Sequence, residues 1–146
     1  MIAVDSNILV YAHRIDSPWY AHAYQVVAEL AEGESPWAIP WPCIVEFLGV
    51  ATNPRIYQPP SRLHEALEQV RSWLESPSLV LLSESTGFFP TLATTLNQAG
   101  VVGARVHDAR IAALCIHHGV TTLYTADRDF SRFARLHTRN PLVGGE

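Results

Sequence analysis

The stretch RVHDARIAALCIHHGVTTLYTA, residues 105–126, carries the clearest structural pattern in the chain. In its first part the apolar residues recur at helical spacing, and Gly119 stands where glycine typically ends a helix. Its second part, from Val120, is an apolar run of strand length. A helix that leads directly into a strand is half of a βαβ unit, so this stretch predicts a parallel sheet covered by helices.

The remainder of the sequence repeats this alternation. Strand patterns occupy 1–5, 37–40 and 79–82, and the tail from His137 has room for one more short strand. Helix patterns occupy 6–14, 18–32, 42–53, 62–76 and 89–100, with a short helix or turn over 129–136. Because no linker or repeat divides them, we expect residues 1–146 to form one α/β domain. Its central sheet should be mostly parallel, with helices on both faces.

The same patterns predict three local details. Ser6 or Asn7 is expected to cap the first helix, and the run 79–82 is expected to be a buried strand. The helix over 62–76 should place four apolar side chains on one face, namely Leu63, Leu67, Val70 and Leu74.

The composition is that of an ordinary globular protein and limits how the chain can bind nucleic acid. Hydrophobic residues make up 48% and charged residues 16% of the 146 positions, which excludes a disordered chain. The formal net charge of −4 argues against binding nucleic acid through overall charge. All ten Lys or Arg residues are arginines, and six of them follow Gly103, where they suit bidentate contacts with phosphate.

Other features of the composition predict an unremarkable interior and no membrane contact. No apolar run approaches the length of a membrane span and no signal peptide is visible, so we expect a cytoplasmic protein. Cys43 and Cys115 lack the paired spacing of a zinc site and are expected to be small buried apolar residues. The four tryptophans are expected to pack in the core or in a dimer interface rather than stack on bases.

Four carboxylates are expected to meet at one edge of the predicted sheet. Asp5 ends the first strand, and Asp127 follows the strand that begins at Val120. The carboxyl ends of parallel strands share one edge, and ligands bind there where the strand order reverses. Glu46 and Asp108 lie within otherwise apolar helices. Each is ordinary when taken singly, as an exposed position or as a first-turn acid favoured by the helix dipole, but the same sheet edge can collect all four.

Together these acids predict a metal site. Four carboxylates within a few ångströms repel one another unless some are protonated or a cation neutralises them. The chain contains no lysine, so a divalent ion is the plausible partner, and ligands that are all oxygen suit Mg²⁺ or Mn²⁺ rather than zinc. Such an ion lowers the pKa of bound water and neutralises phosphate charge, which predicts hydrolysis of a phosphodiester.

Four segments together resemble the PIN-domain ribonucleases, in particular the VapC toxins of bacterial toxin–antitoxin pairs. They are MIAVDSNILVYA (1–12), CIVEFLGVATNPR (43–55), VHDARIAAL (106–114) and TLYTADRDFSRF (122–133), and the resemblance spans nearly the whole chain. It implies a metal-dependent endoribonuclease whose acidic quartet is Asp5, Glu46, Asp108 and Asp127. Polar support beside this quartet is implied at Ser6, Asn7 and Thr125.

The resemblance also implies partners. A toxin of this family forms a homodimer and is bound by a cognate antitoxin that occludes the active site. Residues 59–103 match no catalytic motif, so the RNA substrate stays open. A PIN nuclease of RNA processing and a non-catalytic PIN-like binding module are the alternatives.

Three other families that bind ligands at strand ends do not fit this sequence. A phosphoacceptor receiver domain resembles it but uses a lysine in its pocket. A phosphatase of the haloacid-dehalogenase type requires an aspartate where this chain has Asn7, and a dinucleotide-binding enzyme requires G-x-G-x-x-G after a strand.

The residues after Asp127 are expected to have two roles, which are contact with RNA and capping of a turn. Arg128 and Arg132 flank the acids of this segment and are predicted to contact the RNA backbone. Asp129 precedes FSRFAR, and we expect it to cap that turn by accepting hydrogen bonds from the amides near Ser131 or Arg132.

Overall fold

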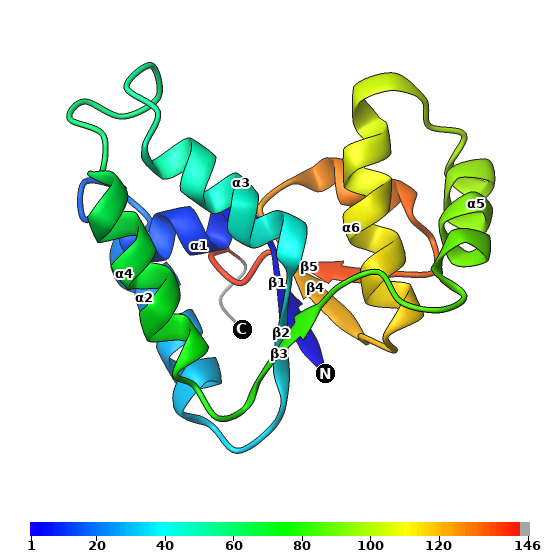
Figure 1. Cartoon of the computed structure of the whole chain (residues 1–146), viewed down its shortest axis with the longest axis horizontal. Coiled ribbons are helices and arrows are strands. Elements are labelled where there is room, and N and C mark those ends of the chain that lie inside the picture. Colours follow the sequence, from blue (N-terminus) through cyan, green and yellow to red (C-terminus); the bar gives the residue numbers. More distant parts are fainter. Residues whose placement is uncertain (144–146) are drawn as a thin grey trace.

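The computed structural model describes residues 1–143 and contains a five-stranded sheet with its connecting helices (Figure 1). The strands are β1 (Ile2–Val4), β2 (Trp37–Pro40), β3 (Leu79–Leu82), β4 (Thr122–Tyr124) and β5 (His137–Arg139). The α-helices are α1 (Ser6–His13), α2 (Tyr20–Glu32), α3 (Trp41–Ala51), α4 (Leu63–Leu74), α5 (Phe88–Ala99) and α6 (Val106–His117). Short 3₁₀ helices, η1 (Gly103–Arg105) and η2 (Arg128–Arg132), precede α6 and follow β4. The predicted α/β alternation is confirmed.

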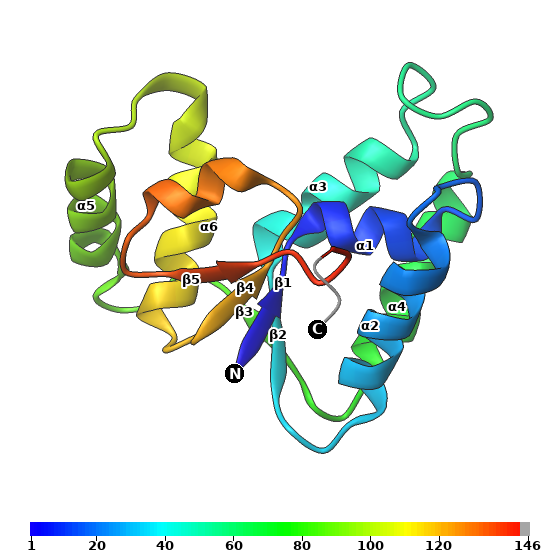
Figure 2. The ribbon, with the colours of Figure 1, turned by 180° about the vertical axis from the view of Figure 1, so that it is seen from behind.

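The order of the strands places β1 at the centre of the sheet. The order is β3-β2-β1-β4-β5, and every neighbouring pair is parallel. The chain moves from β1 outward to β2 and β3, and then crosses to the other side of β1 to form β4. The strand order therefore reverses between β1 and β4, where Val4 pairs with Tyr124. Helices α1–α4 gather on one side of the sheet and α5 and α6 on the other (Figures 1 and 2).

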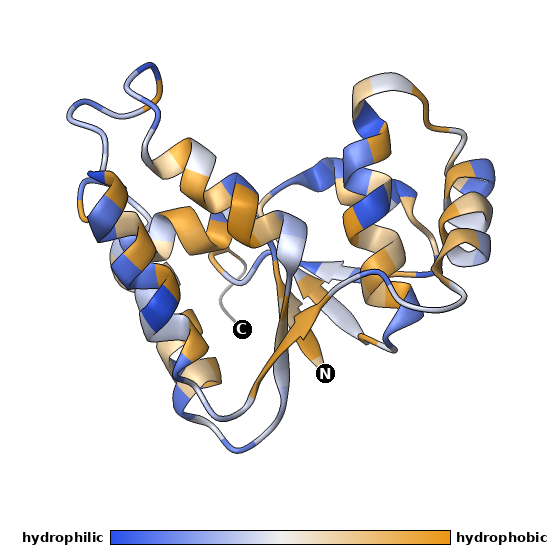
Figure 3. Cartoon of the chain, in the orientation of Figure 1, coloured by the Kyte–Doolittle hydropathy of each residue, from blue (hydrophilic) through white to orange (hydrophobic). Residues whose placement is uncertain are grey.

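The core lies between the sheet and these helices. Trp37, Phe47 and Leu123 are fully buried, and the ring of Phe47 meets that of Trp73 edge to face with a centroid distance of 4.8 Å. Figure 3 shows β1 and β3 as strongly apolar, whereas the helices alternate between apolar and polar residues. Helices with one face in the core and one in solvent have this pattern. No helix in residues 1–143 combines the length and hydrophobicity that a membrane crossing requires.

Glycines lie at the ends of α5 and α6, as predicted for Gly119. Gly100 follows α5 with a φ of 65°, and Gly119 comes one residue after the cap of α6 with a φ of 72°. These are left-handed backbone conformations that glycine adopts without a steric penalty.

Two predicted details are wrong. The buried face of α4 is formed by Ala66, Val70 and Trp73, while Leu63 and Leu74 are 62% and 42% exposed. The large Trp73 ring packs on Phe47 and fixes which side of the helix turns inward. The strand β3 is only partly buried, with Val80 40% exposed, because it stands at the edge of the sheet.

Candidate active site

One cavity of about 340 Å³ collects all four of the predicted acids. Asp5 follows β1 directly, and Asp127 lies three residues beyond β4, so both lie at the point where the strand order reverses. Glu46 comes from the middle of α3 and Asp108 from the first turn of α6. Ligands bind at this position in open α/β sheets because loops from both sides of the reversal leave a crevice there.

Asp5 is the most firmly held of the four acids. Its side chain is buried and accepts hydrogen bonds from the amide of Ser6 at 2.7 Å, the hydroxyl of Thr125 at 2.7 Å and Nδ2 of Asn7 at 3.2 Å. The bond to the Ser6 amide makes Asp5 the N-cap of α1, so the prediction of Ser6 or Asn7 as the cap is wrong. Burial raises the pKa of Asp5 and the charge of Glu46 adds to the rise, while the hydrogen bonds oppose it.

Asn7 and Thr125 tie the start of α1 to the end of β4. Nδ2 of Asn7 donates to Oγ1 of Thr125 at 3.2 Å, and its Oδ1 accepts from the amide of Ala126 at 3.0 Å. The amide of Asp127 donates to Oγ1 of Thr125 at 3.0 Å. These contacts fix the backbone that carries Asp127 relative to Asp5. Asn7 and Thr125 therefore lie beside the acids, where the sequence predicted supporting polar residues.

Ser6 connects Asp5 to Glu46. Its amide donates to Asp5, and its hydroxyl donates to the carboxylate of Glu46 and lies 3.5 Å from Oδ1 of Asp5. Glu46 is otherwise exposed. Cys43, one turn earlier on α3, places its Sγ 3.5 Å from Oδ1 of Asp5 and is fully buried. Both cysteines are buried as predicted, and burial raises the pKa of the Cys115 thiol to about 12.

Asp108 stands next to an arginine that the sequence did not single out. Partial burial raises its pKa and the negative charge of Asp127 raises it further, while Arg105 lowers it. Nη1 of Arg105 lies 4.0 Å from Oδ2 of Asp108 and donates to Oδ2 of Asp129 at 2.6 Å. The spacing of Arg105 and Asp108 by three positions in a helical stretch is the signal that could have identified this pair.

The roles of Asp127 and Asp129 differ from the predicted ones. Asp127 caps η2, because its Oδ1 accepts from the amide of Asp129 at 2.9 Å. The carboxylate of Asp129 instead binds Arg105, which lowers the pKa of Asp129. The predicted cap by Asp129 is therefore wrong: η2 begins at Arg128, two residues before the segment that Asp129 was expected to cap, so the cap falls at Asp127.

The two arginines that were predicted to contact RNA are exposed and do not line the cavity. Nε of Arg132 donates to the backbone oxygen of Asp129 at 3.1 Å, and Arg128 lies in the same short helix. The cavity has instead an aromatic lining that sequence reasoning missed, which includes Tyr11 and Tyr57. Tyr57 lies in the segment between α3 and α4, which carries no recognisable motif. Trp37 and Trp73 are buried, and no tryptophan lines the cavity.

The donor set of the cavity suits a hard divalent cation. Four carboxylates line it, and none of its lining residues is Arg, Lys or His. Oxygen ligands of this kind are typical of Mg²⁺ and Mn²⁺ sites. Within residues 1–143, no three Asp, Glu, His or Cys side chains are already grouped closely enough to hold a metal ion. The residues therefore fit such an ion by their chemistry and by their place in one cavity.

Comparisons with known proteins show to which sequences and folds this chain is similar. The sequence profile of the PIN domain matches residues 2–136. Ribonuclease VapC43 of Mycobacterium tuberculosis is 32% identical over 144 residues, covering 99% of this chain and 97% of that protein.

Solved structures show the same fold. A complex of VapBC2 from Rickettsia felis with a DNA fragment from its promoter matches with a TM-score of 0.69 and 22% identity, covering 95% of this chain and 98% of that one. The Mycobacterium tuberculosis toxin VapC20, described as cleaving the sarcin-ricin loop, matches with a TM-score of 0.66 and 14% identity over 94% of this chain and 99% of that one. A match of the family profile over nearly the whole chain, with a relative of this similarity, shows that the protein belongs to the PIN domain family, alongside the VapC ribonucleases.

Proposed function

We propose that this protein is a metal-dependent endoribonuclease that acts as the toxin of a toxin–antitoxin pair. One observation carries the proposal: four carboxylates from four separate elements line one cavity at the reversal of a parallel sheet, and Arg105, which lies 4.0 Å from Asp108, does not line it. The relatives named as VapC ribonucleases support RNA as the substrate.

The residues have distinct roles in this proposal. Asp5, Glu46, Asp108 and Asp127 would hold Mg²⁺, with Mn²⁺ as an alternative. Such an ion supplies a Lewis acid for the phosphate and lowers the pKa of a bound water. Thr125, Asn7 and Ser6 orient the carboxylates through the hydrogen bonds described above. Supporting contacts of this kind keep ligands in place before the cation arrives.

The basic residues around the cavity are proposed to bind the RNA backbone. Arg128 and Arg132 are exposed on η2, directly after Asp127. Each phosphate contact that is lost should lower the slope of log affinity against log salt concentration by about 1. Arg128→Gln and Arg132→Gln, measured singly and together, test this assignment, and an unchanged salt slope would assign both residues to structure or to a partner.

The partners proposed for this chain are based on a structurally similar complex. The Rickettsia felis structure is of a VapBC complex, and we propose that this chain likewise has a cognate antitoxin and forms a homodimer in the cytoplasm. Expression of the active protein should arrest growth, and co-expression of the antitoxin should restore it. Active enzyme that is harmless when expressed would favour a role in RNA processing.

A cleavage assay on the purified protein is the central test. The protein should cut single-stranded RNA in the presence of Mg²⁺ or Mn²⁺, and EDTA should stop it. Asp108→Asn should lower the rate by about a hundredfold or more, because a metal ligand is weakened while the fold is retained. Cleavage that persists in EDTA by protein free of metal would overturn the metal proposal. A folded protein that binds RNA without cutting it would indicate a binding module.

A further inference from the structure

The cavity has a second lining whose chemistry differs from that of the acids. Besides the four carboxylates it includes apolar and aromatic side chains from α1, from the end of α3 and from the segment that follows α3. We call four of them, Tyr11, Val50, Ile56 and Tyr57, the tyrosine wall. Ile56 is 54% exposed. An exposed apolar side chain beside four carboxylates contributes nothing to binding a cation, so this wall requires a different explanation.

Tyr57 stands between the acidic cavity and its larger neighbour. The guanidinium carbon of Arg14 lies 4.4 Å from the centroid of the Tyr57 ring, and Arg14 lines the adjacent cavity of about 470 Å³. One face of the ring is therefore covered by a cation, while the residue also contributes to the acidic cavity. Burial raises the pKa of Tyr57, and Tyr11, which lines the same cavity, adds to the rise.

Arg14 also anchors the segment that carries Tyr57. Its guanidinium donates to both carboxylate oxygens of Asp16, at 2.9 and 2.8 Å, to the backbone oxygen of Pro59 at 2.9 Å and to the hydroxyl of Ser61 at 3.2 Å. Most of its hydrogen-bonding capacity is used in these contacts, and only 11% of its side chain is exposed. This arginine consequently has a positioning role and is not free to bind a ligand.

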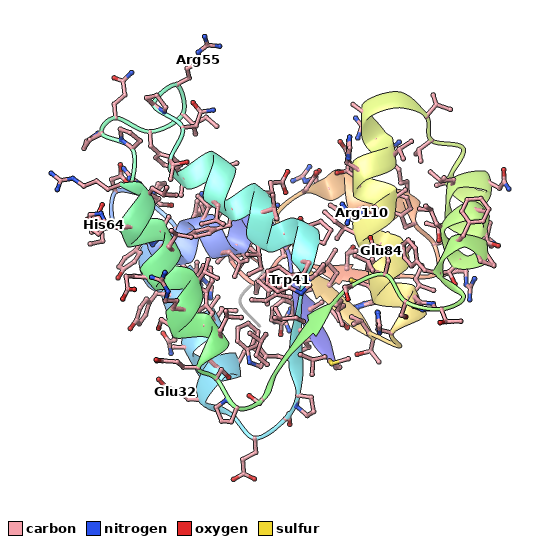
Figure 4. The ribbon with its side chains drawn as sticks, viewed as in Figure 1. Glu32, Trp41, Arg55, His64, Glu84 and Arg110 are labelled. Carbon is pink, nitrogen blue, oxygen red and sulfur yellow. The ribbon has the colours of Figure 1, made fainter. Side chains whose placement is uncertain are left out.

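The backbone of the same segment is ordered by its own hydrogen bonds. The amides of Ile56 and Tyr57 both donate to the backbone oxygen of Asn53 at 3.0 Å. The amide of Ser61 donates to the backbone oxygen of Ala51 at 2.9 Å. Arg55 projects from the outer end of this loop, away from the body of the molecule (Figure 4). The wall is thus preformed, and a positive charge stands next to it in sequence.

We propose that the tyrosine wall binds an unpaired nucleobase of single-stranded RNA, next to the bond that the acids cleave. The proposal rests on the proposed ribonuclease function. A nucleotide combines a charged phosphate with a flat apolar base, and this cavity combines acids that suit a phosphate-bound cation with aromatic rings that suit a base. Bases in a duplex are stacked on one another and unavailable to side chains, so the site selects an unpaired nucleotide.

A binding experiment tests the wall without relying on cleavage. Asp108→Asn protein is mixed with short single-stranded RNAs that carry 2-aminopurine, whose fluorescence falls on stacking, at successive positions along the strand. One position should be quenched on binding. Adding Tyr57→Leu should abolish the quenching and weaken binding about tenfold, whereas Tyr57→Phe should preserve both because it keeps the ring. Tyr24, an exposed tyrosine of α2 outside the cavity, provides Tyr24→Leu as the matched control.

An abasic substitution separates stacking from a structural effect. At the quenched position, removal of the base should weaken binding to the Asp108→Asn protein by the same factor of about ten, and Tyr57→Leu should then have no further effect. If Tyr57→Leu weakens intact and abasic RNA equally, the ring has a structural role and the proposal is wrong. Absence of quenching at every position, or equal affinity for duplex RNA, would also overturn it. Failure of the wild-type protein to cut RNA would overturn the proposed function alone, because the binding result is obtained without cleavage.

Discussion

The acid at the end of the central strand and the acids on the helices are held in very different ways. Asp5 is buried and bonded to Ser6, Asn7 and Thr125, so its position is set by the fold itself. Glu46 is exposed, with Ser6 as its hydrogen-bonding partner among the described residues, and Asp108 is half-buried, 4.0 Å from Arg105. The cavity therefore has one carboxylate fixed by the fold and others with fewer contacts to hold them. The same contrast explains why no group of three ligating side chains is already assembled within residues 1–143.

The largest expected difference between these acids is in how much their removal lowers the stability of the protein. Asp5→Ala removes the cap of α1 and leaves Thr125 and Asn7 without their acceptor, so it should lower the free energy of unfolding by roughly 2–3 kcal/mol. Relief of the buried charge, whose pKa is raised, offsets part of the loss. Asp108→Ala should change stability by less than ~0.5 kcal/mol. Chemical denaturation in EDTA measures both.

The amide variant of Asp5 is the control for this comparison. Asparagine caps a helix about as well as aspartate but has a single acceptor oxygen, so Asp5→Asn should recover the capping part of the stability and none of the activity. Equal stability losses from Asp5→Ala and Asp108→Ala would remove the distinction between the acid fixed by the fold and those with fewer contacts.

A smaller loss of stability is expected on substitution of Thr125, which supports Asp5 without lining the cavity. Thr125→Val keeps the shape of the side chain but removes the hydroxyl that donates to Asp5 and accepts from Asn7 and Asp127. Stability should fall by about 1–2 kcal/mol, and the rate of RNA cleavage by about 10–100-fold. Thr125→Ser retains the hydroxyl and should restore both. If the valine variant cleaves RNA at the wild-type rate, the orientation of Asp5 does not depend on this contact.

The smallest change in stability is expected on substitution of Asp129. Asp129→Asn weakens an exposed ion pair with Arg105, and such pairs contribute little to stability, so unfolding should be unchanged. Asp127→Asn should also keep its capping bond to the Asp129 amide, yet it removes a proposed metal ligand and should abolish cleavage. Parallel rate and denaturation measurements on the two variants decide the matter, and an inactive but folded Asp129→Asn protein would place both acids at the metal.

The part of the site that was predictable is the part governed by the sheet. The alternation of strands and helices fixes which ends of the strands share an edge, and this was sufficient to bring Asp5 and Asp127 together. Glu46 and Asp108 are ordinary when taken singly, and the shared sheet edge together with the resemblance to a family connected them to the other two acids. Placing Asp5 and Asp127 needed only periodicity and the order of elements.

Features that depend on tertiary packing were not predictable. The inward face of α4 was chosen by the contact of Trp73 with Phe47, and β3 is partly exposed because it ended up at the edge of the sheet. The cap of η2 depended on a two-residue difference in where the turn begins. Tyr57 entered the cavity through a segment held by Arg14, a residue 43 positions away that no local pattern connects to it.

The hydrogen bond between Thr125 and Asp5 joins residues 120 positions apart in a chain of 146. During synthesis β1 and Asp5 are made first, but β4, one of the two strands that pair with β1, is made almost last. A growing chain can therefore form the helices α1–α4 long before it has the Thr125 and Asp127 that complete the cavity. An enzyme that cuts RNA would in this way stay inactive while it is still being translated, and fragments released early would contain Asp5 without a working site.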